Sequence, residues 1–313
     1  MPVMQRPGHQ AWQQMQLQER ERAYSPSSCI GGHYLPFIQA YQTRSQEAHA
    51  QCLAQGARWS THSYGQCITQ RWLLCMPPLQ NAARQPGPVG LLVYIHGGYW
   101  QELSAQDSLF PAAACIERGL AFAALDYTLA PQATVADIIA QCRSALTWLF
   151  RHAAALGVDA QRIVVAGSSA GAHLSAMVAL PGALPDGHGG MFALHAAVLV
   201  SGIYELEPLV GTSINTALGL NPQSAQQASP LRAPLRGFPR TQVCYGAVET
   251  YEFKRQSQEF SQALTAAGAQ CEMFEVQQRN HFDVILDLVD PSTRLAATTW
   301  ALFGQDCSVL RQG

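Results

Sequence analysis

The stretch RIVVAGSSAGAHLSA at residues 162–176 restricts the fold more than any other part of the chain. It begins with a short run of apolar, mostly β-branched residues, which is typical of a buried strand. A turn of small residues follows, and the chain then favours a helix over 170–180. Because a strand buried on both faces has to be covered by helices on both sides, this stretch predicts a sheet with flanking helices.

The same alternation of apolar strands and amphipathic helices runs through most of the chain. Strands are expected within residues 67–76, 89–98, 120–127, 162–167, 196–202, 241–246 and 271–276. Helices are expected in the second half of 24–57, around 104–118, and over 134–156, 170–180 and 252–267. This pattern predicts an α/β fold with a mostly parallel, doubly wound sheet.

The chain is long enough for one large core, because 48% of its 313 residues are hydrophobic. We therefore expect residues 1–313 to form a single α/β domain. Residues 1–23 read as a polar N-terminal arm, and the Pro-, Ser- and Asn-containing stretch 203–239 interrupts the alternation. We interpret 203–239 as an excursion over the carboxyl edge of the sheet, forming a small cap or lid together with the N-terminal region.

Composition argues against several kinds of partner. The net charge of −2 and a charged fraction of 13% give no basic patch, so neither nucleic acid nor an anionic membrane is expected. No stretch reaches the roughly 18–20 apolar residues of a membrane helix, and the polar N-terminus does not resemble a secretory signal. The nine cysteines include no C-x-x-C pair, which favours reduced thiols in the cytoplasm over disulfides or a zinc site.

The turn G167-S168-S169-A170-G171 fits the pattern G-x-S-x-G between a strand and a helix. In that context the central serine, Ser169, is raised over the sheet edge at the N-terminus of the helix, where it can act as a nucleophile. Ser168 is its neighbour in the turn. The alternative is that the small residues only permit close packing of strand and helix.

A serine nucleophile needs a base, and the base needs a carboxylate, in the chain order Ser, acid, His. Glu249 follows the expected strand 241–246, and His281 follows the last strand, so both lie where a doubly wound sheet gathers active-site groups. Glu252 and Asp283 are rival acids. The alternatives are that His281 is a solvated loop histidine and that Glu249 is a helix N-terminal charge.

The motif H96-G97-G98-Y99-W100 follows the strand at 89–95. Acyl hydrolysis places negative charge on the carbonyl oxygen, which preorganised backbone N–H groups can stabilise. We expect Gly98, Tyr99 and Ala170 to supply these donors. His96 is interpreted as a residue that braces the turn.

Several of these motifs together resemble the α/β-hydrolase fold and, within it, the hormone-sensitive-lipase-like branch: HGGYW, LDYTLAP (125–131), GSSAGAH (167–173) and NHFDVI (280–285). HGGYW, SGIYELEPL (201–209) and EFKRQSQEF (252–260) resemble the kynurenine formamidase (arylformamidase) family and its esterase-like relatives. The resemblance covers roughly residues 24–303.

This resemblance implies a serine hydrolase that cleaves an aryl formamide such as N-formylkynurenine. It implies Ser169 as nucleophile, His281 as base, Glu249 as acid and 97–99 as the oxyanion loop, with no cofactor. Members of the family usually carry Asp where this chain has Glu249. A metal-dependent type of formamidase also exists, but the chain lacks a matching His/Asp cluster, so no metal is expected.

Five residues beside these loops are candidates for lining a substrate pocket: Tyr99, Trp100, Ser168, Tyr204 and Phe282. The alternative is that the aromatic residues only pack the cap. Glu205 is considered as a partner for a substrate ammonium group, although a solvated charge is the simpler role. Asp126 is interpreted as a structural carboxylate.

Two other functions stay open at this point. The same residues would serve a broad carboxylesterase acting on short acyl or aryl esters, or an enzyme that cleaves a carbamate or thioester. A non-catalytic binding protein on the same scaffold would be expected to have lost the serine or the histidine. A homodimer is considered only by analogy with this branch.

Overall fold

The computed structural model describes residues 12–78 and 87–304 and contains an eight-stranded sheet. The strand order is β1-β2-β4-β3-β5-β6-β7-β8, and β3 to β8 are parallel, whereas β2 is antiparallel to both of its neighbours. The strands are β1 (Arg58–Ser63), β2 (Arg71–Met76), β3 (Val89–Ile95), β4 (Ala121–Leu125), β5 (Val158–Ser168), β6 (Ala196–Val200), β7 (Arg240–Val248) and β8 (Cys271–Asn280). The expected mostly parallel sheet is thus confirmed.

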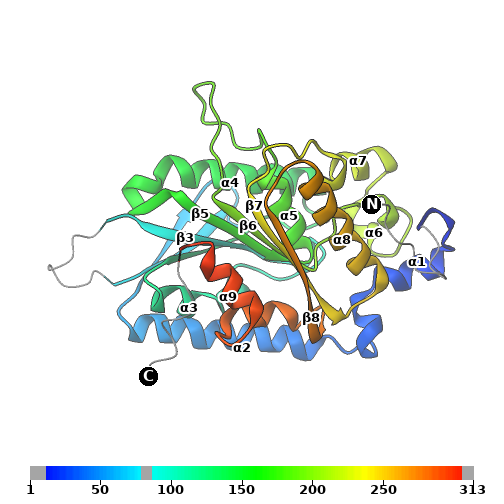
Figure 1. The fold of residues 1–313 in the computed structure, drawn as a ribbon, viewed down its shortest axis with the longest axis horizontal. Helices are drawn as coiled ribbons and strands as arrows, with labels where there is room; N and C mark the ends of the chain where they lie inside the picture. The colour runs from blue at the N-terminus through cyan, green and yellow to red at the C-terminus, as the bar shows by residue number, and fades with distance from the viewer. Residues whose placement is uncertain (1–11, 79–86, 305–313) are drawn as a thin grey trace.

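Helices cover both faces of this sheet (Figure 1). One core cluster includes α4 (Val135–Leu156), α5 (Ala170–Ala179) and α8 (Tyr251–Ala266). The other includes α2 (Leu35–Ala54), α3 (Ala112–Glu117) and α9 (Arg294–Ala301). Alternate residues of β3 enter the two clusters, because successive side chains of a strand point to opposite faces.

One expected helix differs in extent, and one strand was not expected. The helix expected around 104–118 is a 3-10 turn at Gln106–Ser108 followed by the short α3, whose N-cap is Pro111. Proline disfavours helical geometry in the residue before it, which accounts for the interruption. Strand β1 was not expected, because this edge strand is largely exposed and RWSTHS carries no apolar alternation.

The segment 203–239 contains the short helices α6 (Asn215–Leu218) and α7 (Pro222–Gln227). It lies at the same end of the molecule as helix α1 (Leu17–Ala23) (Figure 1). The two segments are joined by side chains of α1. Arg20 Nη2 donates to the Val210 carbonyl at 3.1 Å, and Glu21 accepts from the Ser213 amide at 2.6 Å. Residues 17–23 of the expected polar arm are therefore an ordered helix, and residues 1–11 lie outside the described part.

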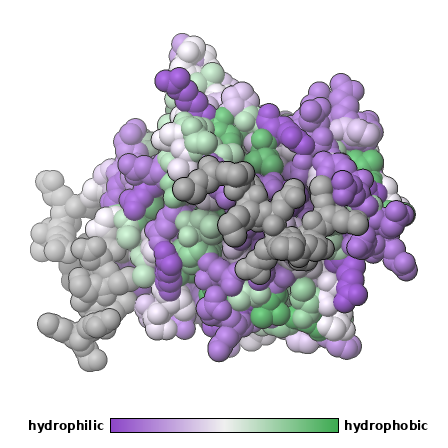
Figure 2. All heavy atoms as spheres, turned by 45° about the vertical axis from the view of Figure 1, so that its right-hand side comes forward, coloured by the Kyte–Doolittle hydropathy of each residue, from purple (hydrophilic) through white to green (hydrophobic). Residues whose placement is uncertain are grey.

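None of the helices in the described ranges is long and apolar enough to cross a membrane. On the face turned toward the viewer in Figure 2, hydrophobic residues occur in separate patches among hydrophilic ones.

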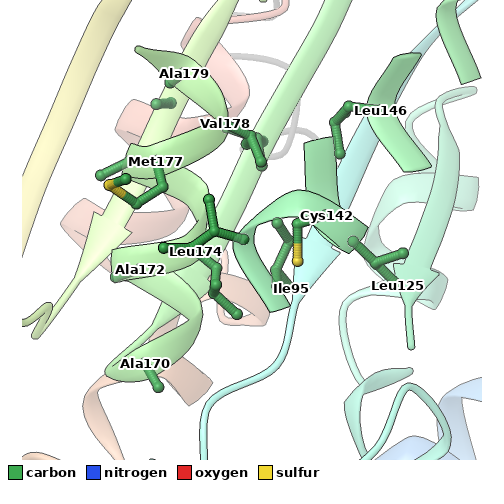
Figure 3. Packing of buried hydrophobic residues seen from close by; sticks show 14 of the residues in the cluster. Ile95, Leu125, Cys142, Leu146, Ala170, Ala172, Leu174, Met177, Val178 and Ala179 are labelled. Carbon is green, nitrogen blue, oxygen red and sulfur yellow. The ribbon is translucent and has the colours of Figure 1, made fainter. Parts of the chain in front are cut away.

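The turn between β5 and α5 depends on two glycines. A Cβ on Gly171 would lie 2.0 Å from the Ile95 carbonyl oxygen, and one on Gly167 would lie 2.4 Å from the Gly171 backbone. Figure 3 shows the result, with the apolar side of α5, including Leu174, next to Ile95. The helix that carries the serine motif is therefore packed directly against the end of β3.

His173 of α5 joins three segments. The Trp100 indole N–H donates to its Nδ1 at 3.3 Å, so its Nε2 carries the proton that is donated to the Ala228 carbonyl at 2.7 Å. The ring is fully buried, and burial lowers the pKa of His173 to about 4. The neutral ring thus connects the HGGYW loop, α5 and the segment 203–239.

We expect Gly171→Ala to destabilise the protein by roughly 1–3 kcal/mol or more, because the new Cβ has to displace backbone rather than a movable side chain. Urea unfolding measures the effect. Gly87→Ala is the matched control, since nothing lies within 4 Å of a Cβ at that position. Equal stability of the two variants would contradict the close approach described above.

The buried His173 also predicts a pH dependence of stability. Because its pKa of about 4 lies below the roughly 6.5 of an unfolded histidine, unfolding takes up a proton at low pH. The stability that depends on a neutral His173 is fully present above pH 6.5. It is lost as the pH falls toward 4, and the free energy of unfolding then drops by up to roughly 3 kcal/mol. We expect the free energy of unfolding to fall less steeply across this window in His173→Gln. Parallel curves for the two proteins would refute the assignment.

Candidate active site

Ser169 occupies the turn between β5 and α5 in a backbone conformation that few residues adopt, with φ of 57° and ψ of −123°. Such strain persists only where the surrounding packing enforces it, and it is common at functional sites. The Ser169 amide donates to the Val200 carbonyl at 2.9 Å, which ties the turn to β6. The side chain lies at the N-terminus of α5 and lines a cavity.

Glu249 and His281 are in direct contact. His281 Nδ1 lies 2.8 Å from Glu249 Oε2, and the side chain of Glu249 is fully buried. Glu249 follows the last residue of β7, and His281 follows the last residue of β8. With Nδ1 paired to the carboxylate, the ring is left to use Nε2 for other chemistry.

The loop of His281 is held by its own side chains. The Asn280 side-chain oxygen accepts from the Phe282 amide at 2.8 Å, and Asp283 accepts from the Asn280 amide at 2.7 Å. Phe253 of α8 packs edge-on against the imidazole with ring centroids 4.4 Å apart. The ring therefore has a fixed position at the cavity wall.

The HGGYW loop follows β3 with left-handed backbone at Gly98, Tyr99 and Trp100. The Gly98 carbonyl accepts from the amides of Gln101 and Glu102, at 2.9 and 3.0 Å, which closes the turn. Tyr99 donates its hydroxyl hydrogen to the Tyr24 carbonyl, so the N-terminal region is bonded to this loop.

A cavity of about 210 Å³ joins these loops. Its lining includes Gly98, Tyr99, Ser168, Ser169, His281 and Phe282. Much of the remaining wall is aromatic, and it includes Tyr34, Tyr41, Tyr94 and Phe110. Among the described residues of the lining, Glu102 is the one acidic side chain, and there is no lysine or arginine.

Two of the expected pocket residues lie elsewhere. Trp100 is fully buried and its indole N–H is bonded to His173, so it packs behind the loop. Tyr204 is also fully buried and stacks on Phe260 with centroids 4.2 Å apart. Both expectations were wrong, because proximity in sequence to an active-site loop does not fix the direction of a side chain. Ser168 and Phe282 do line the cavity.

Glu205 fits neither of its expected roles. Its side chain is buried and pairs with Arg232 at 2.6 Å and with Arg255 at 3.2 Å. It is therefore neither solvated nor in the cavity wall. This ion pair network links 203–239 to α8 through Arg255, which also pairs with Glu252 at 2.7 Å.

The rival acids do not contact the imidazole through a hydrogen bond. Glu252 accepts from the Tyr24 hydroxyl at 2.5 Å, and Asp283 accepts from the Asn280 backbone. His96 is buried and stacks on Tyr127 at 4.1 Å, which agrees with its expected bracing role, and burial lowers its pKa.

Asp126 is the structural carboxylate that the sequence predicted. It accepts from the Ala105 amide at 2.7 Å and from Arg71 Nε at 2.9 Å. Over the described ranges, no group of three or more His, Cys, Asp or Glu side chains has the arrangement of a metal site.

Sequence reasoning missed two parts of the site. Ser201 lies directly after β6 and donates its hydroxyl hydrogen to Glu249 Oε1 at 2.6 Å. Residues 24–27 and Ile38 line the cavity, although they lie far from the catalytic motifs in sequence. For Ser201 the available signal was its place at the carboxyl end of a parallel strand. For residues 24–27 the sequence carries no comparable signal.

Comparison with known proteins agrees with this architecture. The model of the BD-FAE family matches residues 79–232. Kynurenine formamidase from Danio rerio is 29% identical over 307 residues, which cover 94% of this chain and 99% of the relative.

Two solved structures share the fold. A proposed thioesterase from Silicibacter sp. TM1040 superposes with a TM-score of 0.74 at 27% identity, covering 90% of this chain and 98% of that one. A thermophilic esterase from Thermogutta terrifontis has a TM-score of 0.63 at 24% identity, covering 78% of this chain and 91% of that one. The chain is a hydrolase of the α/β-hydrolase fold, and it is similar to kynurenine formamidase over nearly its whole length.

Proposed function

We propose that this protein is a serine hydrolase that cleaves an aryl formamide such as N-formylkynurenine to the arylamine and formate. The observation that carries the proposal is the 2.8 Å contact between His281 Nδ1 and Glu249 Oε2 at the wall of the cavity that Ser169 also lines. The relationship to kynurenine formamidase over 94% of the chain supports the substrate class.

In the proposed reaction, Ser169 Oγ attacks the formyl carbon while His281 Nε2 takes the hydroxyl proton. The amides of Gly98, Tyr99 and Ala170 stabilise the oxyanion, and the partial positive charge at the N-terminus of α5 adds to this effect. His281 then gives its proton to the departing arylamine nitrogen. Water, deprotonated by the same imidazole, attacks the formyl-serine. The bond from the formyl carbon to Ser169 Oγ then breaks, the imidazolium returns the proton to Oγ, and formate is released.

Glu249 supports this cycle from behind the imidazole. Its carboxylate fixes the tautomer with hydrogen on Nδ1 and stabilises the imidazolium that forms during attack. Because the carboxylate is buried, its charge is poorly screened by solvent and acts strongly on the ring. The glutamate thus serves where the family usually has aspartate.

The cavity suits a small acyl group and a flat leaving group. Tyr34 and Phe37 both stack on Phe282 with ring centroids 5.7 Å away, beside His281. Aromatic rings prefer such offset contacts with one another, so this wall would favour an aryl leaving group. An arylamine is also less basic than an alkylamine, and its expulsion needs less help from the acid.

We treat residues 203–239 and the N-terminal region as a cap within a single domain. Ile214 and residues 24–27 line the cavity, which supports the interpretation of the two segments as a cap over the site. The described cysteines are all free, which supports a reducing, cytoplasmic location. A homodimer stays a prediction by analogy.

The second candidate is a broad carboxylesterase that uses the same residues. The two solved neighbours described as a proposed thioesterase and an esterase fit this alternative. A panel of N-formylkynurenine, formanilide, p-nitrophenyl acetate and an aryl carbamate separates the two. We expect kcat/KM to be highest for the formamides, and a preference for the acetate ester by several orders of magnitude would overturn the formamidase proposal.

Replacing the proposed nucleophile or base should remove most of the activity. We expect Ser169→Ala and His281→Ala each to lower kcat by about 10³-fold or more. Ser168→Ala is the matched control, because its hydroxyl lies in the same turn but has no part in the chemistry, and its kcat should change far less. Loss of activity in Ser168→Ala with retention in Ser169→Ala would reassign the nucleophile.

A further inference from the structure

Ser201 is a buried serine whose hydroxyl group meets the proposed acid. It follows β6 directly and has left-handed backbone, with φ of 52°. Its amide donates to the Cys244 carbonyl at 2.8 Å, which fixes it to β7, the strand that also leads to Glu249. Its Oγ donates to Glu249 Oε1 at 2.6 Å.

The two oxygens of Glu249 have different partners. Oε1 accepts from Ser201 Oγ at 2.6 Å and from the Gly246 amide at 2.5 Å. Oε2 faces His281 Nδ1 at 2.8 Å. The two donors on Oε1 therefore determine which oxygen meets the imidazole and at what angle.

The two hydrogen bonds to Oε1 restrict a glutamate side chain more than they would an aspartate. Glutamate has one more rotatable bond between backbone and carboxylate, so holding it in one geometry requires more constraint. The Gly246 amide lies three residues away on the same segment and constrains only one side of Oε1. Ser201 follows β6 and donates to the same oxygen from another side, so the carboxylate is held from two directions.

We propose that Ser201 is a positioning residue that orients the carboxylate of Glu249 toward His281. The inference rests on the catalytic roles proposed above for Ser169, His281 and Glu249. Ser201 acts through the carboxylate and does not touch the substrate, since it is fully buried and is not part of the cavity lining.

The hydroxyl group also moderates the charge that His281 meets. A hydrogen bond donated to a carboxylate stabilises its negative charge and makes it less basic. Without it, the Gly246 amide still holds Oε1, and the less stabilised charge of Glu249 would attract the imidazolium of His281 more strongly. Because the base works only when it is deprotonated, the acidic limb of the rate profile would move to higher pH.

Other titratable groups around the pair do not change charge near neutral pH. Burial raises the pKa of Tyr41, Tyr204 and Cys244, so all three stay neutral there. Two acids lie close to the loop: Asp287 pairs with Arg279 at 2.8 Å, and Asp283 accepts from the Asn280 amide. Burial raises the pKa of Asp283. Its titration is common to the wild-type protein and the variants, so it does not account for a difference between them.

The test measures how fast a fluorophosphonate probe labels Ser169 between pH 5 and 9, which requires no knowledge of the substrate. Ser201→Ala removes the hydroxyl group, and Ser201→Gly removes it while relieving the left-handed backbone. Ser257→Ala is the matched control, because Ser257 of α8 is equally buried and its hydroxyl has no hydrogen-bond partner in the described structure. Thermal unfolding checks that each variant is folded at every pH used.

We expect both Ser201 variants to label about tenfold more slowly at the plateau, with the acidic limb moved up by roughly half a pH unit. Ser257→Ala should follow the wild-type curve. An unchanged limb in both Ser201 variants would overturn the inference, as would an equal shift in Ser257→Ala. Failure of the wild-type protein to label, or undiminished labelling of His281→Ala, would overturn the catalytic assignment and this inference with it.

Discussion

The close approach of α5 to the end of β3 is the constraint on which the site depends. A Cβ at Gly171 would lie 2.0 Å from the Ile95 carbonyl, so only glycine lets the helix begin where it does. That contact sets Ser169 beside the HGGYW loop, which continues from Ile95. The geometry proposed for the nucleophile and the oxyanion donors is therefore a result of backbone packing before any catalytic side chain is considered.

The remaining groups arrive through the parallel order of the strands. Glu249 and His281 follow β7 and β8, which are neighbours in the sheet, so their side chains meet although 31 residues of helix and strand separate them. Ser201 follows β6, on the other side of β7. Three adjacent strand ends thus supply one hydrogen-bonded chain from hydroxyl to carboxylate to imidazole.

The sequence was sufficient for the sheet and for these strand ends, because buried parallel strands are apolar along their whole length and are easy to recognise. It was not sufficient for the directions of side chains in loops. Trp100 and Tyr204 carry the right chemistry for a pocket, yet both are turned into the core by His173 and Phe260. The buried ion pairs of Glu205 could not be predicted either, because its arginine partners lie 27 and 50 residues away in the sequence. Long-range contacts of this kind leave no local pattern.

The cavity wall made by residues 24–27, Tyr34 and Ile38 lies outside residues 79–232, where the family model matches. The serine turn and the HGGYW loop lie inside that range. The serine turn and the HGGYW loop are consequently encoded in a different stretch of the gene from this part of the cavity wall. Under the proposed function, substitutions in the N-terminal stretch would change the wall beside the leaving group and leave the turn that holds Ser169 unaltered.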